Sequence, residues 1–349
     1  MDMKKRSASY VYRRRRILAE ALLLMALSLA LVCLACTLGA ARLGLREILG
    51  ILGDRLSGRE IQNRSVGVIL LKLRLPRVLL SYIVGAALSV SGACMQGVFQ
   101  NPMAEPGLLG VSSGAAIGAA IAMIFNLQAS WLGFGAVSLF AFAGGTLAVL
   151  LVLGIARTRG RTSTLSLLLS GIAVSSFLSA VLAGLLTLNH EKMESVYLWT
   201  MGSFTTASWS KFAAAAPVTL VGTLFLLVFA RDLNALQLGD GEARLLGISP
   251  AAVRALALGV ATLMTATAVS LSGVIGFVGL MAPHAVRALT GPDHRSLLPL
   301  SALTGGLFLL VADTLARTLL PPVELPVGVV TSFFGGPFFL ILLKRSEKY

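Results

Sequence analysis

Apolar residues form long runs along this chain, separated by short breaks that contain polar residues, glycine or proline. A helix needs roughly 20 apolar residues to cross the hydrocarbon core of a bilayer. The last two runs before residue 297 form one apolar stretch that only Ser272 and Gly273 interrupt. The pattern predicts an all-α polytopic membrane protein with about ten transmembrane helices, at residues 17–39, 75–96, 107–125, 133–156, 165–187, 212–230, 254–272, 274–290, 297–317 and 325–343.

Composition excludes a soluble enzyme domain and a disordered chain. Of 349 residues, 56% are hydrophobic and only 13% are charged, whereas a soluble domain carries about 25% charged residues. The formal net charge of +14 would suggest a nucleic-acid partner in a soluble protein. In a membrane protein, Lys and Arg instead report which side of the membrane each loop occupies. We therefore expect the lipid bilayer, and no nucleic acid, as a partner.

Basic residues near both ends predict how the chain is oriented. Residues 1–16 contain seven Lys and Arg, and residues 344–348 contain three more. Such residues collect on the cytoplasmic side, and an even number of spans places both termini on one side. We predict a cytoplasmic basic N-terminus over 1–16, a single transmembrane domain over 17–345, and both termini in the cytoplasm. The first apolar run is longer than the core of a signal peptide, which predicts a retained helix.

One basic segment departs from this charge rule. Residues 42–77 would lie outside the membrane, yet they contain eight of the 29 basic residues. These are Arg42, Arg46, Arg55, Arg59, Arg64, Lys72, Arg74 and Arg77. A long connector tolerates such charge, and alternatively some of these arginines contact an acidic partner outside. The pattern leaves both interpretations open.

A short motif occurs twice and suggests internal symmetry. Gly92 in Ser89-Val90-Ser91-Gly92 precedes Pro102, and Gly273 in Ser270-Leu271-Ser272-Gly273 precedes Pro283 at the same spacing. With five spans in each half, two such halves would have opposite orientations, as in many transporters. The motif therefore predicts two inverted five-helix halves, although short matches in a chain rich in Gly, Ser and Ala also arise by chance.

Two cytoplasmic connections have unusual composition. The segment Asn101–Pro106 contains two prolines, which break helices, so it is either an ordinary turn or a constriction beside a pathway. Residues 231–250 form the longest interior cytoplasmic loop and contain Leu233, Leu236 and Leu238 outside any span. Apolar residues rimmed by polar ones indicate a protein contact. We predict that this loop docks a cytoplasmic partner.

The sequence contains no motif for catalysis or for energy coupling. It has no Gly-x-x-x-x-Gly-Lys-[Ser/Thr] loop for ATP, no catalytic triad and no His, Cys or carboxylate cluster with metal-ligand spacing. Asp313 is the one carboxylate well inside a predicted span, whereas proton-driven transporters carry ionisable groups in the bundle. The energy source therefore lies on another chain. An ion-coupled secondary transporter and an intramembrane enzyme are the alternatives, and the latter would need a polar catalytic cluster.

Several long, ordered motifs resemble one known family over residues 17–345. In the first half they are Leu73-Arg74-Leu75-Pro76-Arg77, Gly85–Leu88, Ser91–Ala93, Gln96 and Asn101–Ser112. In the second half they are Gly276–Arg287, Asp293–Arg295, Ala312-Asp313, Arg317, Glu324–Val329 and Gly335–Phe338. Together they resemble the permease family of ABC importers for iron-siderophores, haem and vitamin B12.

This resemblance implies an assembly in the bacterial cytoplasmic (inner) membrane. Each multi-pass subunit would have ten helices, and a homodimer would enclose a central pathway. Two cytoplasmic ABC ATPase subunits would hold ATP and Mg²⁺, and an extracytoplasmic binding protein would deliver the substrate. The chain itself would bind no cofactor and would not be an enzyme. The substrate class would be a metal chelate, with an iron-siderophore as first expectation and haem or cobalamin as alternatives.

The resemblance also implies roles for particular residues. Arginines at the outer ends of spans, here Arg74, Arg77 and Arg317, would receive glutamates of the binding protein. The inner gate would include Asn101 and Met103, where Met replaces the family's usual Leu, together with Thr164 and Leu165. Residues 232–248 would form two short helices that fit into the ATPase, with contacts from Asn234, Leu236, Leu238, Gly239, Ala243, Leu246 and Gly247.

Overall fold

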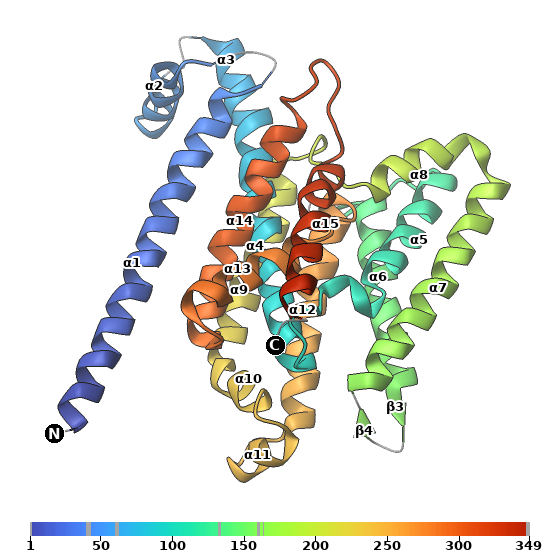
Figure 1. The fold of residues 1–349 in the computed structure, drawn as a ribbon. Coiled ribbons are helices and arrows are strands. Elements are labelled where there is room, and N and C mark those ends of the chain that lie inside the picture. Colours follow the sequence, from blue (N-terminus) through green and yellow to red (C-terminus); the bar gives the residue numbers. More distant parts are fainter. Residues whose placement is uncertain are drawn as a thin grey trace.

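The computed structural model describes residues 2–39, 43–59, 63–131, 134–158, 161–162 and 164–346. Helices dominate the described residues (Figure 1). They are α1 (Asp2–Thr37), α2 (Leu45–Leu56), α3 (Arg64–Val68), the π-helix η1 (Ile69–Arg74), α4 (Leu75–Phe99), the 3-10 helix η2 (Pro106–Leu109), α5 (Val111–Ile124), α6 (Ala136–Ala156), α7 (Thr164–Leu188), the 3-10 helix η3 (His190–Lys192), α8 (Met193–Thr200), α9 (Trp209–Val228), α10 (Ala230–Leu236), α11 (Asp240–Leu245), α12 (Pro250–Ser272), α13 (Val278–Thr290), α14 (His294–Ala316) and α15 (Val327–Ser346).

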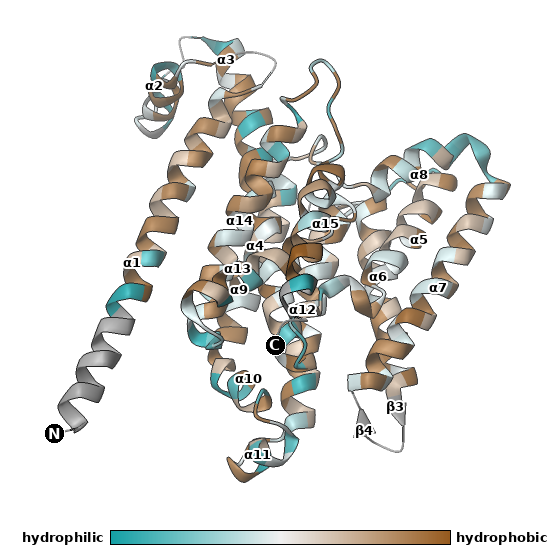
Figure 2. Ribbon diagram, viewed as in Figure 1, coloured by the Kyte–Doolittle hydropathy of each residue, from teal (hydrophilic) through white to brown (hydrophobic). Residues whose placement is uncertain are grey.

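Seven of the described helices are long and apolar enough to cross a membrane. They are Arg15–Thr37, Arg64–Phe99, Ala136–Ala156, Thr164–Leu188, Trp209–Val228, Pro250–Ser272 and His294–Ala316. Two shorter apolar helices, Val111–Ile124 and Val327–Leu342, correspond to two further predicted spans. Figure 2 shows apolar residues along the long helices and hydrophilic ones on α11. A multi-helix membrane architecture is therefore confirmed; the count of ten spans stays a prediction.

The predicted span at 274–290 is shorter in the structure than a crossing helix. The chain leaves α12 after Ser272, and Phe277 adopts a left-handed backbone with φ of 68°. Helix α13 then begins at Val278 and has 13 residues. At 1.5 Å per residue it is about 20 Å long, less than the roughly 30 Å of hydrocarbon. The apolar run alone did not reveal this break.

Two connections also contain strands, so the chain is not purely α. β1 (Ser130–Trp131) pairs antiparallel with β2 (Phe134–Gly135) between α5 and α6. β3 (Arg157–Thr158) pairs with β4 (Arg161–Thr162) between α6 and α7. Each strand has two residues, and the hairpins only close turns between neighbouring helices.

The predicted outer connector at 42–77 is largely helical. Helix α2 lies beside the end of α1, and α3, η1 and α4 form one continuous helix from Arg64 to Phe99 (Figure 1). Helix α1 ends at the same upper end of the bundle at which this continuous helix begins. Helices α10 and α11 lie at the opposite, lower end, toward which α15 runs.

The core of the bundle is the close contact between α4 and α14. A Cβ atom added to Gly85 would lie 2.3 Å from the carbonyl oxygen of Gly305. Small residues allow helix backbones to approach in this way, and membrane helices associate largely through such packing. Helices α12 and α13 pack against α4 as well, while α5, α6 and α7 form a neighbouring group (Figure 1). The α4–α14 pair therefore holds the centre of the molecule together.

The repeated motif has different local structure in its two copies. Gly92 lies within α4, where it packs against Gly279, whereas Gly273 follows the last residue of α12. Helices α4 and α12 run in opposite directions, as an inverted repeat requires (Figure 1). The inverted halves and the cytoplasmic location of both termini stay predictions.

Replacing Gly85 with alanine should weaken the α4–α14 contact. The added methyl group would force the two backbones apart, because the obstructing atom is a carbonyl oxygen. Overpacking of this kind costs about 1–3 kcal/mol, so the midpoint of thermal unfolding in detergent should fall. Gly259→Ala is the control, since no atom lies within 4 Å of its added Cβ. Equal midpoints for the two variants would contradict this packing.

Candidate functional sites at the two ends of the bundle

The three arginines singled out from the sequence meet at the upper end of the bundle. Arg74 ends η1, Arg77 lies in the first turn of α4, and Arg317 follows the last residue of α14. All three line one cavity of about 760 Å³, together with Phe204 and Glu324. Arg77 and Arg317, which are 240 positions apart in the chain, thus line the same cavity.

Arg77 is the centre of a buried ion-pair network. Its Nε lies 3.0 Å from Oδ2 of Asp313, and its Nη2 lies 2.9 Å from Oδ1 of the same carboxylate. Its Nη1 also donates to Glu324 at 2.8 Å. The Asp313 side chain is 1% exposed and that of Arg77 is 13% exposed. The one carboxylate well inside a span is therefore paired, and this pair joins α4 to α14.

Arg74 and Arg317 bind the last turn of α1. Nη1 of Arg74 donates to the carbonyl oxygens of Cys36 at 2.8 Å and Thr37 at 3.3 Å, and Nη2 of Arg317 donates to that of Ala35. The last carbonyls of a helix lack partners within the helix, and the helix dipole makes this end favourable for cations. The guanidinium groups therefore cap α1 and hold it against α4 and α14.

These arginines are more buried than docking residues on a surface would be. Arg74 is 7% exposed and Arg317 is 8% exposed. Nε of Arg317 is buried and has no hydrogen-bond partner among the residues that the structure describes. Access to the guanidinium groups is through the cavity. The proposed role in docking is untested and stays a prediction.

The loop after α4 folds as a side-chain-capped turn. Oδ1 of Asn101 accepts the backbone N–H of Met103 at 2.9 Å, after Gln100 has taken a left-handed φ of 51°. Burial raises the pKa of the Glu105 carboxyl, and a backbone hydrogen bond from Phe277 opposes that rise. This turn therefore lies against the segment that leads into α13.

The second predicted gate element lies at the start of α7. Thr164 is half-buried, and Leu165 is 65% exposed. No hydrogen bond between described residues joins this pair to Asn101 or Met103. The gate therefore stays a prediction for all four residues.

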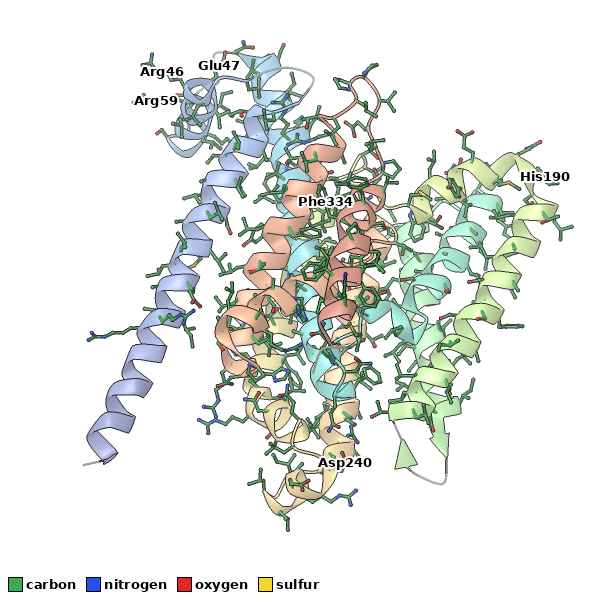
Figure 3. All side chains as sticks on the ribbon, in the orientation of Figure 1. Arg46, Glu47, Arg59, His190, Asp240 and Phe334 are labelled. Atoms are coloured by element: carbon green, nitrogen blue, oxygen red, sulfur yellow. The ribbon has the colours of Figure 1, made fainter. Side chains whose placement is uncertain are left out.

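The predicted coupling segment contains two short helices at the lower end, as expected. These are α10 and α11, and Figure 3 shows Asp240 at this tip. Gly239, with a φ of 110°, is the N-cap residue of α11, and Gly247, with a φ of 77°, follows the end of that helix, both in conformations that favour glycine. The guanidinium of Arg254 on α12 holds the pKa of Asp240 below its usual range, with an Nη1–Oδ2 distance of 2.9 Å.

Helix α10 is bound to both central helices. Nδ2 of Asn234 donates to Oδ1 of Asp293 at 2.7 Å, and the backbone N–H of His294 donates to Oδ1 of Asn234 at 2.9 Å. On the other side, Nε2 of Gln100 donates to the carbonyl oxygen of Leu236. The first pair of bonds reaches the start of α14, and the last reaches the end of α4. Asp293 and His294 belong to a motif that carries the family resemblance, but neither these residues nor Gln100 were predicted to contact α10.

The predicted coupling residues divide into anchors and exposed side chains. Leu236 and Ala243 are fully buried, whereas Leu238 is 64% exposed and Leu246 is 62% exposed. Leu245, which was not among the predicted coupling residues, is 89% exposed. The adjacent Leu245-Leu246 pair before Gly247 was the available signal. Three leucines are therefore exposed at the lower tip, and exposed apolar residues of this kind indicate a protein contact.

Comparison with known proteins identifies the family of this chain. The model of the FecCD transport family matches residues 25–345. The chain belongs to the FecCD transport family. It is 47% identical over 280 residues to the cobalamin import system permease protein BtuC of Halobacterium salinarum, which covers 80% of this chain and 74% of that protein.

Other FecCD relatives cover nearly the whole chain. The hemin transport system permease protein HmuU of Yersinia pestis is 43% identical over 331 residues, 94% of this chain and 96% of that protein. A metal-chelate type ABC transporter solved in an inward-facing conformation superposes with a TM-score of 0.81. It is 30% identical and covers 93% of this chain and 98% of the solved one. The resemblance inferred from the motifs is thereby confirmed.

Removing the buried carboxylate should destabilise this FecCD protein strongly. Asp313→Asn leaves the Arg77 guanidinium without its main counter-charge at a site where both side chains are largely buried. Breaking a buried pair costs about 3–5 kcal/mol. Glu324→Gln is the matched control, because that carboxylate is 39% exposed and should contribute less than about 1 kcal/mol. The thermal midpoints of both variants test this, and equal losses would contradict it.

Proposed function

We propose that this chain is the membrane-spanning permease subunit of an ABC importer that carries a metal chelate into the cytoplasm. The observation that supports this is the match to the FecCD model over residues 25–345. The absence of a Walker A sequence from the chain agrees with ATP hydrolysis on separate subunits. Asp313, paired with Arg77, is a poor proton carrier, which disfavours the ion-coupled alternative.

The proposed assembly lies in the bacterial cytoplasmic membrane. Two copies of the chain enclose the pathway, and two ABC ATPase subunits bind at the lower end, which faces the cytoplasm. The upper end, with its arginine cavity, faces outward and receives the binding protein. The basic residues of 1–16 and 344–348 support this orientation, since such residues collect on the cytoplasmic side.

The upper cavity is suited to a carboxylate of the binding protein. Arg77 pairs with Asp313 and Glu324, whereas Arg74 and Arg317 donate to carbonyls of α1, so three guanidinium groups and two carboxylates leave one positive charge in excess. An incoming glutamate would compete with Glu324, the more exposed of the two carboxylates, for Nη1 of Arg77. Arginine pairs with carboxylates through two parallel hydrogen bonds, so such docking would also fix orientation.

The lower tip is suited to an apolar groove of the ATPase. Leu238, Leu245 and Leu246 would enter that groove, while Asn234 and Leu236 hold α10 to α14 and α4. Movement of the ATPase pair would then be transmitted to the upper end through α4 and α14. The same movement would displace the gate residues, which are Asn101 and Met103 on one side and Thr164 and Leu165 on the other. Such coupling requires only contacts that differ between two states.

The substrate is proposed at the level of a chemical class. The relatives above are named for cobalamin and hemin, and FecD of Escherichia coli, 40% identical over 279 residues, is named for Fe(3+) dicitrate. All three are metal chelates. An iron-siderophore is our first candidate for this chain, with haem and cobalamin as alternatives.

Purification from the host in mild detergent tests the proposed function. We expect the tagged chain to bring with it an ABC ATPase, and reconstituted vesicles to accumulate a metal chelate only when ATP is supplied. The ligand of a co-purified binding protein would identify the chelate. A chain that purifies alone, with uptake that survives ATP depletion, would instead indicate an ion-coupled transporter.

Neutralising the cavity should weaken docking of the binding protein. Arg74→Gln combined with Arg317→Gln keeps side-chain donors for the carbonyls of α1 but removes two positive charges. We expect the affinity of the binding protein for the permease in nanodiscs to fall by at least about tenfold. Lys192→Gln, outside this cavity, is the control and should leave affinity unchanged. Unchanged affinity in the double variant would exclude the cavity as the docking site.

A charge at the lower tip should prevent assembly with the ATPase. Leu245→Asp places a carboxylate where the ATPase groove would close over the side chain, and burying an unpaired charge is costly. We expect ATPase subunits to be lost from the purified complex while the permease keeps its thermal midpoint, because the side chain is 89% exposed. Leu127→Asp, in the turn between α5 and β1 at the opposite end, is the control. Full assembly of the Leu245 variant would contradict the assigned surface.

A further inference from the structure

The cavity and the coupling surface leave most of the basic outer segment unexplained. Of its eight basic residues, Arg74 and Arg77 belong to the cavity, and Arg42 lies outside the described residues. The other five are exposed, and among the described residues none of them has an ion pair. They are Arg46, Arg55, Arg59, Arg64 and Lys72. Three of these lie on α2 or directly after it.

Helix α2 has two apolar faces instead of one. Ile48 and Ile51 are 2% and 6% exposed and pack into a cluster with Leu70 and residues of α1. Leu45 and Leu49, four residues apart on a neighbouring stripe, are 53% and 56% exposed. An amphipathic helix on a globular protein needs only the first face. The second apolar face requires a different neighbour.

The third face of α2 is polar and exposed. Arg46, Gly50 and Gly53 lie on it, and Glu47 on the same side uses its carboxylate to accept the backbone N–H of Gly44 at 2.9 Å. Figure 3 shows Arg46 and Arg59 on the side of α2 that points away from the bundle. Asp54 lies on this side too, so the face is polar and carries charges of both signs. A helix with a protein face, an apolar face and a polar face fits a boundary between protein, hydrocarbon and water.

Helix α2 lies at such a boundary between protein, hydrocarbon and water. The helix lies beside the upper end of α1 (Figures 1 and 3). On α1, Leu22, Leu29 and Leu34 are 56%, 69% and 51% exposed, so one side of this helix faces hydrocarbon. Leu45 and Leu49 therefore continue the lipid-facing surface of α1 to its outer end. The arginine cavity is lined by residues after α1, by η1 and α4, by residues that follow α14 and by residues before α9, and no residue of α2 lines it.

We propose that α2 lies in the outer membrane interface and binds anionic phospholipids. Leu45 and Leu49 insert among the acyl chains, and Arg46, Arg55 and Arg59 bind headgroup phosphates. Charge complementarity and continuity with α1 favour lipid over an acidic protein as the occupant, because an acidic protein would leave the leucine stripe exposed. Arginine suits this role, since its planar fork pairs with phosphate oxygens.

Nitroxide labels on α2 of the full chain in nanodiscs test this position. Leu49→Cys carries the label on the apolar stripe, and Gly50→Cys carries it on the polar face, where an added Cβ meets no atom within 4 Å. Labelled wild-type protein gives the background, because Cys36 and Cys94 are buried and Cys33 is half-buried. We expect the Leu49 label to collide mainly with oxygen and the Gly50 label mainly with a water-soluble nickel chelate. Equal access of the nickel chelate to both labels would overturn the proposal.

A second measurement tests the lipid headgroup. In nanodiscs of phosphatidylcholine, a growing share of phosphatidylglycerol should reduce nickel access to the Leu49 label severalfold. Arg46→Gln combined with Arg59→Gln should abolish that dependence while the label stays in the interface. A Leu49 label that becomes protected only when binding protein is added would overturn the proposal and assign α2 to protein docking. These readouts need no transport activity, so they do not depend on the proposed function.

Discussion

The close approach of α4 and α14 is the constraint on which the rest of the structure depends. In a bilayer the lipid chains are as apolar as the side chains, so two helices gain little from burial and associate through packing and polar contacts. Gly85 and Gly305 bring the backbones together in the middle, and Arg77 pairs with Asp313 near one end. At the other end both helices are hydrogen-bonded to α10. Each end of the molecule is thus tied to the same rigid pair.

The outer arginines combine a structural and a proposed functional role. Arg74 and Arg317 satisfy carbonyls of α1 that would otherwise lack partners, and Arg77 balances Asp313. A glutamate from outside would therefore meet groups whose positions are fixed in advance, and less side-chain entropy would be lost on binding. Because the guanidinium groups are buried, a partner can reach them only through the cavity. This favours a projecting side chain of the partner over a flat surface.

Hydrophobic periodicity predicted most of the helices, and motifs that resemble a known family pointed to that family and to Arg74, Arg77 and Arg317. They did not predict the break at Phe277 or the length of α13, because hydropathy does not report a left-handed residue within an apolar run. The bonds from Arg74 and Arg317 to α1 join distant segments, and no local pattern encodes them. The sequence pattern did not predict which leucines are exposed either. Leu236 and Leu245 lie in similar sequence contexts, yet Leu236 is fully buried and Leu245 is 89% exposed. The predicted gate role of Asn101, Met103, Thr164 and Leu165 stays a prediction.

The π-helix η1 accommodates one extra residue near the start of the long helix Arg64–Phe99. The backbone N–H of Leu75 bonds to the carbonyl of Leu70, five residues back, so this stretch holds one residue more than a regular helix would. Because the extra residue widens one turn, the helix on either side of η1 keeps nearly the orientation that it would have without that residue. Removing one residue within η1 would therefore leave α3 facing as before, whereas removing one from the regular part of α4 would rotate everything before it by about 100° about the helix axis. The π-helix thus absorbs a change in length locally and preserves the angular position of the helix that precedes it.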